Sequence, residues 1–401
     1  MVAVPDLTDP LVGPEGPGAL AAVEGRRPNP RLAQATVTLP DGHQVGVSVT
    51  GQGIPLVVVH GFSAEGILYA QTLSRLVGMG YRVIAVDTAG HGGTFGLPAG
   101  GGDLAEYSAL IGRVMDHLGI RRAVLAGHSM GGRLVVELAA TEPDRAIALV
   151  LLDAIVGEIW DRIQQWSRWV PGVLGVIGAT LMVDAATTLP VFRDPKQAVK
   201  LVRLGLPTAV AHARRPWRLM APAISILRSS PSCALLEEVG RQGISTFVLH
   251  GDRDYAVPLS TAKSAAHLAN GQLVVIRGAS HAWVLKDPET LPAIVYELLG
   301  EGLGAAQRRA LLHAGLLPGE VSLTDVEEAF YERGALVQRL APAELTTQGG
   351  EPAPPTRRPR FRCRLTTPLP GRGLSPPMCG YQLHSVVQRP APVGVLSEVR
   401  W

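Results

Sequence analysis

Short runs of apolar, often β-branched residues alternate along this chain with longer segments of helical spacing. The apolar runs cover residues 55–60, 81–87, 121–127, 146–153, 244–250 and 272–278, after a hairpin pattern around Asp41-Gly42. Helical spacing recurs near residues 66–79, 104–118, 131–142, 259–269 and 287–300. Apolar runs without polar alternation are typical of strands buried on both faces. The pattern therefore predicts an α/β fold, with a mostly parallel central sheet flanked by helices.

The alternation stops between about residues 156 and 240, where the pattern is mostly helical. A helical block inserted at this place predicts a cap over the carboxyl ends of the strands. This block contains Trp160, Trp166 and Trp169 within a stretch of ten residues, and Trp217 follows. These tryptophans could line a pocket for an acyl group or meet lipid. The favoured interpretation is that each of them packs against the main domain.

The two ends of the chain differ from its middle. Residues 1–33 are rich in proline and glycine without periodicity, which predicts a flexible leader. Residues 302–340 regain helical spacing, with Ser322 as a plausible N-cap, and predict a helical extension. The Pro/Arg-rich residues 341–401 are predicted to be disordered. Residues 34–301, with the inserted cap, remain as the main domain.

The net charge of the 401 residues is +3, but the charge is unevenly distributed. Between Pro342 and Trp401 there are eight arginines, no lysine and three glutamates, so this tail carries +5 and the rest of the chain −2. The basic balance is therefore a property of the tail. It does not indicate nucleic-acid binding by the folded part.

Three features of the sequence bear on where the protein is located in the cell. Cys233, Cys363 and Cys379 have no disulfide or metal-site spacing, which fits a reducing compartment. The N-terminus lacks the basic and then apolar pattern of a secretory signal. The most apolar stretch, 170–183, contains a proline and three glycines and is too short for a span. We expect a cytoplasmic protein without stable membrane insertion, and the sequence leaves its oligomeric state open.

A serine flanked by glycines stands at a predicted strand-to-helix junction. The segment Gly127-His128-Ser129-Met130-Gly131 follows the strand at 121–127 and opens the helix at 131–142. A turn this sharp excludes side chains at the flanking positions and projects the serine beyond the strand. The helix N-terminus beside it favours negative charge that develops during attack. Ser129 is therefore the candidate nucleophile, and Gly127, His128 and Gly131 support it.

A serine nucleophile needs a base and an orienting acid, and both residue types follow strand ends downstream. His281 comes just after the strand at 272–278 and is the candidate base. Asp252 and Asp254 come just after the strand at 244–250; either could be the acid, and one of the two is expected to cap a turn. Asp153, at the end of an earlier strand, is a third candidate and more typical of a structural role.

Backbone donors for an oxyanion are expected in His60-Gly61-Phe62, directly after the strand at 55–60. Gly61 permits a close approach, so that the Phe62 amide can point into the site, and the Met130 amide is the second donor. The glycine-rich segments 90–93 and 99–102 lack the strand–helix context of a phosphate loop. No nucleotide, metal or organic cofactor is expected.

Taken together, these motifs resemble the α/β-hydrolase fold superfamily over about residues 34–300. The matching segments are HGF (60–62), DTAGHGGT (87–94), GHSMGG (127–132), GDRDYAVP (251–258) and SHAWVLKDP (280–288). The likeness is greatest to esterases, C–C bond hydrolases and cofactor-free haloperoxidases. One departure is that members commonly carry Arg at the place of Ala89 and Ser at the place of Thr94, in a loop that is structural in the family.

The resemblance implies a role for each candidate residue. It makes Ser129 the nucleophile and His281 the base, with the Phe62 and Met130 amides as oxyanion donors. Its G-x-x-D-x-x-x-P pattern fits Gly251 to Pro258 and favours Asp254 over Asp252 as the acid. A serine nucleophile, in place of aspartate, argues against the epoxide hydrolases and haloalkane dehalogenases of the same fold.

The expected activity is hydrolysis of a carboxylic ester of a small, apolar substrate through an acyl-enzyme on Ser129. The motif does not separate esters from thioesters, lactones or a β-diketone split by C–C cleavage. A cofactor-free haloperoxidase or perhydrolase would use the same three residues. A non-catalytic ligand receptor on this fold is the other alternative, although the intact Ser/His/Asp set disfavours it.

Overall fold

The fold is described from a computed structural model, which covers residues 32–99, 102–170, 172–188, 195–316, 322–340, 359–366 and 381–382. The expectation of a flexible leader at residues 1–33 falls mostly on residues 1–31, which lie outside the described residues; Ala33 begins the first strand. The same holds for most of the tail that the sequence predicts to be disordered.

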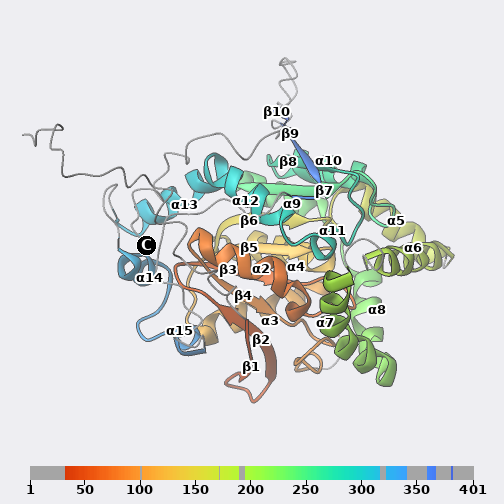
Figure 1. The fold of residues 1–401 in the computed structure, drawn as a ribbon, viewed down its shortest axis with the longest axis horizontal. Helices are drawn as coiled ribbons and strands as arrows, with labels where there is room; N and C mark the ends of the chain where they lie inside the picture. Colours follow the sequence, from red (N-terminus) through yellow and green to blue (C-terminus); the bar gives the residue numbers. More distant parts are fainter. Residues whose placement is uncertain are drawn as a thin grey trace, which may run out of the picture.

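A ten-stranded sheet forms the centre of the described part of the chain, in the order β1-β2-β4-β3-β5-β6-β7-β8-β9-β10 (Figure 1). Its strands are β1 (Ala33–Thr38), β2 (Gln44–Thr50), β3 (Ile54–Val59), β4 (Tyr81–Val86), β5 (Ala123–His128), β6 (Ala146–Leu152), β7 (Thr246–Gly251), β8 (Gln272–Arg277), β9 (Arg362–Thr366) and β10 (Tyr381–Gln382). The strands from β4 to β8 are parallel. The predicted mostly parallel sheet is therefore confirmed.

Helices cover both faces of this sheet. On one face, α3 (Leu104–Leu118), α4 (Met130–Thr141), α9 (Cys233–Arg241) and α10 (Leu259–Leu268) pack side by side. On the other lie α2 (Ala70–Leu76), α12 (Thr290–Leu299) and α13 (Gly302–His313). Shorter helical segments are η1 (Gly66–Tyr69), η2 (Val77–Met79), η3 (Pro143–Arg145) and α11 (Trp283–Lys286).

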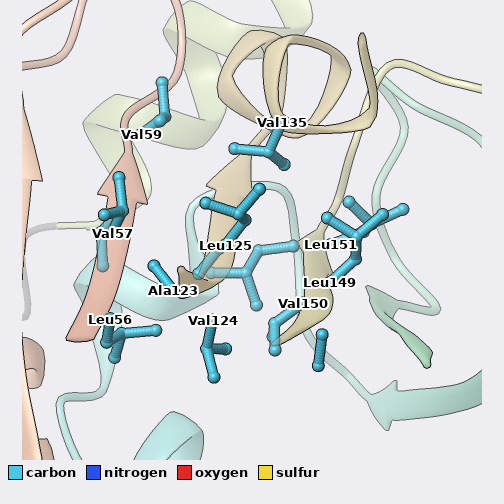
Figure 2. Packing of buried hydrophobic residues seen from close by; sticks show 14 of the residues in the cluster. Leu56, Val57, Val59, Ala123, Val124, Leu125, Val135, Leu149, Val150 and Leu151 are labelled. Carbon is cyan, nitrogen blue, oxygen red and sulfur yellow. The ribbon is translucent and has the colours of Figure 1, made fainter. Parts of the chain in front are cut away.

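Alternate residues of the central strands pack against these two helical layers. In Figure 2, Val57 and Leu125 point to the same side of the sheet as Val135 of α4, whereas Leu56 and Val124 point to the opposite side. Every residue of β3 to β7 is buried, as the unbroken apolar runs predict. A small apolar cavity remains on the side of the sheet to which Leu56 points. Tyr69 is among the residues that line it, and we interpret it as a packing gap in the core.

The cap extends from one side of the sheet (to the right in Figure 1). It consists of α5 (Glu158–Trp169), α6 (Gly172–Thr188), α7 (Pro195–Arg214), η4 (Pro216–Leu219) and α8 (Met220–Arg228). Trp160 is 7% exposed and packs into the core, as expected. The expectation is wrong for Trp166, Trp169 and Trp217, which are 70%, 86% and 58% exposed. The physical reason is that the short helix α5 turns one face to the body, and Trp166 and Trp169 lie on its other side.

The segment after residue 301 continues with α13, α14 (Leu323–Phe330) and α15 (Leu336–Leu340). Ser322 caps α14, and the reciprocal partner of its capping box is Asp325. The tail contributes two strands that the sequence did not predict, β9 and β10. Strand β9 pairs antiparallel with β8, from Leu273 opposite Thr366 to Arg277 opposite Arg362.

Among the described residues, no single helix is long and apolar enough to cross a membrane. One pair of helices, Pro216–Arg228 and Cys233–Arg241, meets the length and composition requirement together, with a bend of 74° between them.

Candidate active site

Ser129 lies at the junction of β5 and α4, in a backbone conformation that side chains rarely adopt. Its φ is +52° and its ψ is −116°. The neighbouring glycines explain how this turn is possible. A Cβ on Gly127 would lie 2.3 Å from the carbonyl oxygen of Gly131, and one on Gly131 would lie 2.1 Å from that of Val59. Only glycine fits these close approaches, so the turn holds Ser129 beyond the strand end.

Asp254 and His281 are paired in the loops after β7 and β8. The Nδ1 of His281 lies 2.7 Å from Oδ2 of Asp254, and both residues are buried. The other carboxylate oxygen, Oδ1, accepts the amides of Ala256 and Val257 at 2.9 and 2.8 Å. Three donors therefore fix the carboxylate, and Nδ1 must carry the proton that His281 donates. This leaves Nε2 of His281 as the basic nitrogen.

The two other acid candidates have different partners. Asp252 is exposed, and its Oδ1 accepts the Gly278 amide at 2.6 Å, which is the turn-capping role expected for one of the two aspartates. Asp153 is fully buried and accepts the Gly251 amide at 2.9 Å and the indole Nε1 of Trp283. Asp153 thus braces the start of the Asp254 loop and the residue two positions after His281.

The charges of this pair shift both pKa values. Burial acts to lower the pKa of His281, but the adjacent charge of Asp254 outweighs it and raises the pKa to about 8. Burial acts in the opposite sense on Asp254, whose pKa is nevertheless lowered by His281. Burial, followed by the charge of Asp254, raises the pKa of Asp153 well above its usual value. The geometry and charges therefore favour Asp254 over Asp153 as the ionised partner of His281.

His128 connects the serine turn to two other parts of the site. Its Nε2 donates to the backbone carbonyl of His281 at 3.0 Å, and its Nδ1 accepts the hydroxyl of Tyr69 at 2.8 Å. Burial lowers the pKa of His128 to about 3, so the ring is neutral and can play both roles. The two imidazole rings lie 4.8 Å apart between centroids. The residue next to Ser129 thus positions the backbone of the candidate base.

The loop after β3 lies directly against the serine. A Cβ on Gly61 would lie 2.9 Å from Nδ1 of His128 and 3.2 Å from Cβ of Ser129. Nε2 of His60 accepts a hydrogen bond from the Thr88 amide at 2.9 Å, and this bond holds the loop after β3 in place. Phe62 follows Gly61, with its ring 5.9 Å from that of His91. Two segments expected to supply oxyanion donors therefore meet beside Ser129.

Met130 belongs to the second of these segments. It is the first residue of α4, and the amide of a first-turn residue has no acceptor within its own helix. The structure therefore brings together Ser129, His128, Gly61, Met130 and the Asp254–His281 pair, and leaves Asp252 outside this group.

One group of described residues has the composition of a metal site. Candidate ligand atoms of Asp153, His250 and Asp254 all lie within 4.8 Å of one another, and the three side chains are buried. However, Oδ2 of Asp254 already binds His281, and Nε2 of His250 donates to the Val257 carbonyl at 2.8 Å. We interpret this group as hydrogen-bonded support beneath the acid.

The cap touches the same loops. Oδ2 of Asp184, in α6, accepts the amide of Ala282 at 2.6 Å, one residue after His281. In α7, the ring of His212 lies 6.0 Å from that of His91. Arg218 of η4 donates to the carbonyl of Thr94 at 2.7 Å. Cap helices α6 and α7 therefore approach the site from two sides.

Tyr69, Trp283, His250 and Asp184 support the site but were not predicted from the sequence. Trp283 stands inside the motif SHAWVLKDP, two residues after His281, which was the available signal for it. The other three lie in helical or strand segments without a recognisable pattern.

Comparison with known proteins agrees with this geometry. The family model described as alpha/beta hydrolase fold matches residues 54–288. A putative non-heme haloperoxidase of Mycobacterium phage D29 is 36% identical over 263 residues, which cover 64% of this chain and 92% of the phage protein. A monoacylglycerol lipase of Mycolicibacterium smegmatis is 28% identical over 251 residues, which cover 61% of this chain and 82% of the lipase.

A solved structure gives the same result for the fold. An esterase from Rhodococcus sp. ECU1013 superposes with a TM-score of 0.51 at 25% identity, over 67% of this chain and 99% of the esterase. The family match, the phage relative and the sheet topology agree, and we conclude that the chain belongs to the alpha/beta hydrolase family.

Proposed function

We propose that this alpha/beta hydrolase cleaves a carboxylic ester of a small, apolar substrate through an acyl-enzyme on Ser129. The observation that carries the proposal is the buried hydrogen bond of 2.7 Å between Asp254 and His281, next to a serine on a strained strand-to-helix turn. A carboxylate, an imidazole and a hydroxyl in this arrangement are the minimum set for nucleophilic acyl transfer.

In the proposed reaction, Nε2 of His281 removes the hydroxyl proton while Oγ of Ser129 attacks the carbonyl carbon. The tetrahedral intermediate collapses, and the protonated imidazole gives its proton to the departing alcohol. Water then attacks the acyl-enzyme, again with proton removal by His281, and the carboxylic acid leaves. Asp254 keeps Nδ1 protonated throughout and stabilises the imidazolium.

The amides of Phe62 and Met130 are the proposed donors to the oxyanion. Their segments approach Ser129 from two directions, and the N-terminus of α4 adds a favourable dipole. Loss of a single oxyanion donor typically costs a factor of about 100 to 1,000 in kcat.

Two relatives support an ester as the substrate class. The Mycolicibacterium smegmatis protein is a monoacylglycerol lipase, and the Rhodococcus protein of the same fold is an esterase. The mainly aliphatic composition of α6 in the cap fits an apolar acyl or alcohol group.

A fluorophosphonate probe tests the nucleophile, because it forms a covalent adduct with an activated serine. We expect the mass of one adduct on Ser129 of the folded protein and none after Ser129→Ala. Short p-nitrophenyl ester hydrolysis should fall by a factor on the order of 10⁶ in Ser129→Ala. Ser260→Ala, at an exposed position of α10, is the matched control and should keep full labelling and turnover. A folded wild-type protein that stays unlabelled would contradict the proposal.

Peroxide chemistry is the second candidate, favoured by the haloperoxidase name of the 36% identical phage relative. In that reaction, hydrogen peroxide replaces water in the attack on the acyl-enzyme, and a peracid leaves that oxidises bromide. Bromination that requires acetate, peroxide and Ser129, at a rate above ester hydrolysis, would favour this activity. Ester hydrolysis without such bromination would favour the esterase.

A further inference from the structure

The cap exposes most of the large apolar side chains that the described part of the protein leaves in contact with solvent. Twelve of the fifteen exposed large apolar residues lie between Trp166 and Ile224. We call these twelve side chains the cap face: Trp166, Trp169, Val170, Val176, Val183, Val199, Val202, Leu206, Val210, Trp217, Met220 and Ile224. Exposed apolar side chains concentrated in one part of a soluble protein mark an interaction site.

The helical period of α7 shows that its exposed stripe is not the face that packs on the body. Val199, Val202, Leu206 and Val210 follow the spacing of one helix face and are 37–57% exposed. Thr208, on the opposite side of the helix, is buried. The side of α7 that contacts the hydrolase body is thus already occupied, and the apolar stripe is available for a second contact.

Helix α6 has a more extreme composition. Its seventeen residues contain a single charged side chain, Asp184, and that carboxylate bonds to the Ala282 amide of the body. Val176 and Val183 are nevertheless 67% and 64% exposed. A helix that is apolar all round is normally surrounded by protein or lipid.

The charge of the cap differs in sign from that of the body. Between Pro195 and Ser232 there are seven basic residues and no acidic one. This segment carries +7 and residues 342–401 carry +5, so the remainder of the chain carries −9. Lys200, Arg203 and Arg214 are exposed beside the apolar stripe of α7. An anionic surface therefore attracts the cap and repels the body, which orients the molecule.

We propose that the cap face docks onto the surface of an anionic phospholipid membrane, with its apolar side chains at the boundary of headgroups and acyl chains. Exposed tryptophan and aliphatic side chains next to lysine and arginine are the combination that such an interface binds. A second copy that meets this one cap to cap is disfavoured as the occupant, because it would place two +7 segments against each other.

Docking in this orientation places the candidate site next to the lipid. Helix α6 bonds to the residue after His281, and α7 contacts the loop of His91. If the proposed esterase function holds, the natural substrates are esters that partition into lipid. This second step depends on the proposed function, whereas docking itself does not.

Vesicle flotation tests the docking. The full chain is mixed with vesicles of phosphatidylcholine alone or with about one third phosphatidylglycerol, and the floating fraction is measured at low and high salt. We expect the anionic vesicles to bind at least tenfold more tightly, an advantage that high salt removes. The fluorescence of the exposed tryptophans should shift to the blue on binding.

Two cap variants and one control separate the contributions of basic and apolar side chains to vesicle binding. Combined Lys200→Glu, Arg203→Glu and Arg214→Glu should weaken binding to anionic vesicles at least tenfold. Combined Trp169→Ser, Val199→Ser and Val202→Ser should reduce the fluorescence shift and weaken binding similarly. The control reverses the charges of three exposed basic residues of the body, Lys263, Arg277 and Arg333, and should bind anionic vesicles nearly as tightly as the wild type, because these residues lie outside the cap face.

Circular dichroism serves as the folding readout for every variant, and hydrolysis of a soluble short-chain ester reports separately on the serine site. Docking is overturned if the wild-type chain floats with neither vesicle, or if the body control loses as much binding as the cap variants. Ser129→Ala should float like the wild type. Docking therefore stands if the serine chemistry proves wrong, and the serine chemistry stands if active protein does not bind lipid.

Discussion

Trp283 and Trp169 belong to two regions of one chain and meet opposite surroundings. Trp283 is fully buried in the hydrolase body, and its indole nitrogen donates to Asp153 beneath the candidate acid. Trp169 ends the first cap helix and is 86% exposed. In the body, buried polar atoms are held in a fixed network; in the cap, apolar side chains face water. The difference indicates that the body supplies preorganised chemistry, while the cap supplies a surface.

The contrast between the body and the cap predicts its largest effect at Asp254, the candidate acid. Asp254→Asn should lower kcat/KM by about 10⁴-fold, because an amide donates where the imidazole needs an acceptor and turns the ring into the wrong tautomer. Asp252→Asn is the matched change two residues away and should cost less than tenfold, since its carboxylate only caps the Gly278 amide. Steady-state kinetics on one soluble ester measures both. The reverse order of effects would make Asp252 the acid.

The same contrast can be measured as stability. Trp283→Ala removes a fully buried ring and should lower the free energy of unfolding by about 3–5 kcal/mol. Trp169→Ala, the same chemical change on the cap, should alter it by less than about 0.5 kcal/mol. Urea unfolding followed by circular dichroism measures both. A large loss from Trp169→Ala would show that the cap face is already packed in solution.

The charge pair of the body makes activity depend on pH. Because Asp254 raises the pKa of His281 to about 8, kcat/KM should rise about tenfold per pH unit below that value and level off above it. The folded-state pKa exceeds the usual 6.5, so the stabilising interaction is complete below pH 6.5 and is lost as the pH rises through 8. Stability should thus fall by about 2 kcal/mol over the range in which activity rises.

A pH titration of kcat/KM and of urea midpoints measures this effect. A cap variant such as Val199→Ser should retain the same midpoint in its activity profile. A wild-type profile that is flat between pH 6 and 8 would argue against His281 as the base.

The smallest expected effect concerns the network behind the serine. Tyr69→Phe removes the hydroxyl that Nδ1 of His128 accepts and should cost about 1 kcal/mol of stability, because a buried acceptor is left without its donor. Activity should fall less than tenfold, since Tyr69 acts only through His128 and through the Gly61 amide, which donates to its hydroxyl at 3.4 Å. An unchanged free energy of unfolding would show that this hydrogen bond contributes nothing.

The sequence predicted those site residues whose positions follow from the end of a strand. Parallel strands deliver their carboxyl ends to one edge of a sheet, so Ser129, Asp254 and His281 could be grouped from spacing alone. The choice between Asp252 and Asp254 depended on resemblance, because both follow the same strand. Their hydrogen bonds, to Gly278 and to His281, distinguish them only in three dimensions.

Other features had no local signal. Tyr69 ends a short helical turn, and nothing in its neighbours indicates that its hydroxyl reaches His128, 59 residues away. The apolar composition of the cap did not specify which side of each helix would meet the body, so burial of Trp166 and Trp169 was expected wrongly. Strand β9 lies in a Pro/Arg-rich segment, and its five residues become a strand through pairing with β8 on one side and β10 on the other.

Strand β9 also determines what the sheet exposes next to β8. Along β8, the backbone groups of Leu273 to Arg277 face β9, and the Arg360 amide just before it donates to Asp287 at 2.7 Å. A chain ending before residue 359 would present β8 as a bare edge, with amides and carbonyls open to the edge of another molecule. The segment outside the family match thus covers the edge that β8 would otherwise expose.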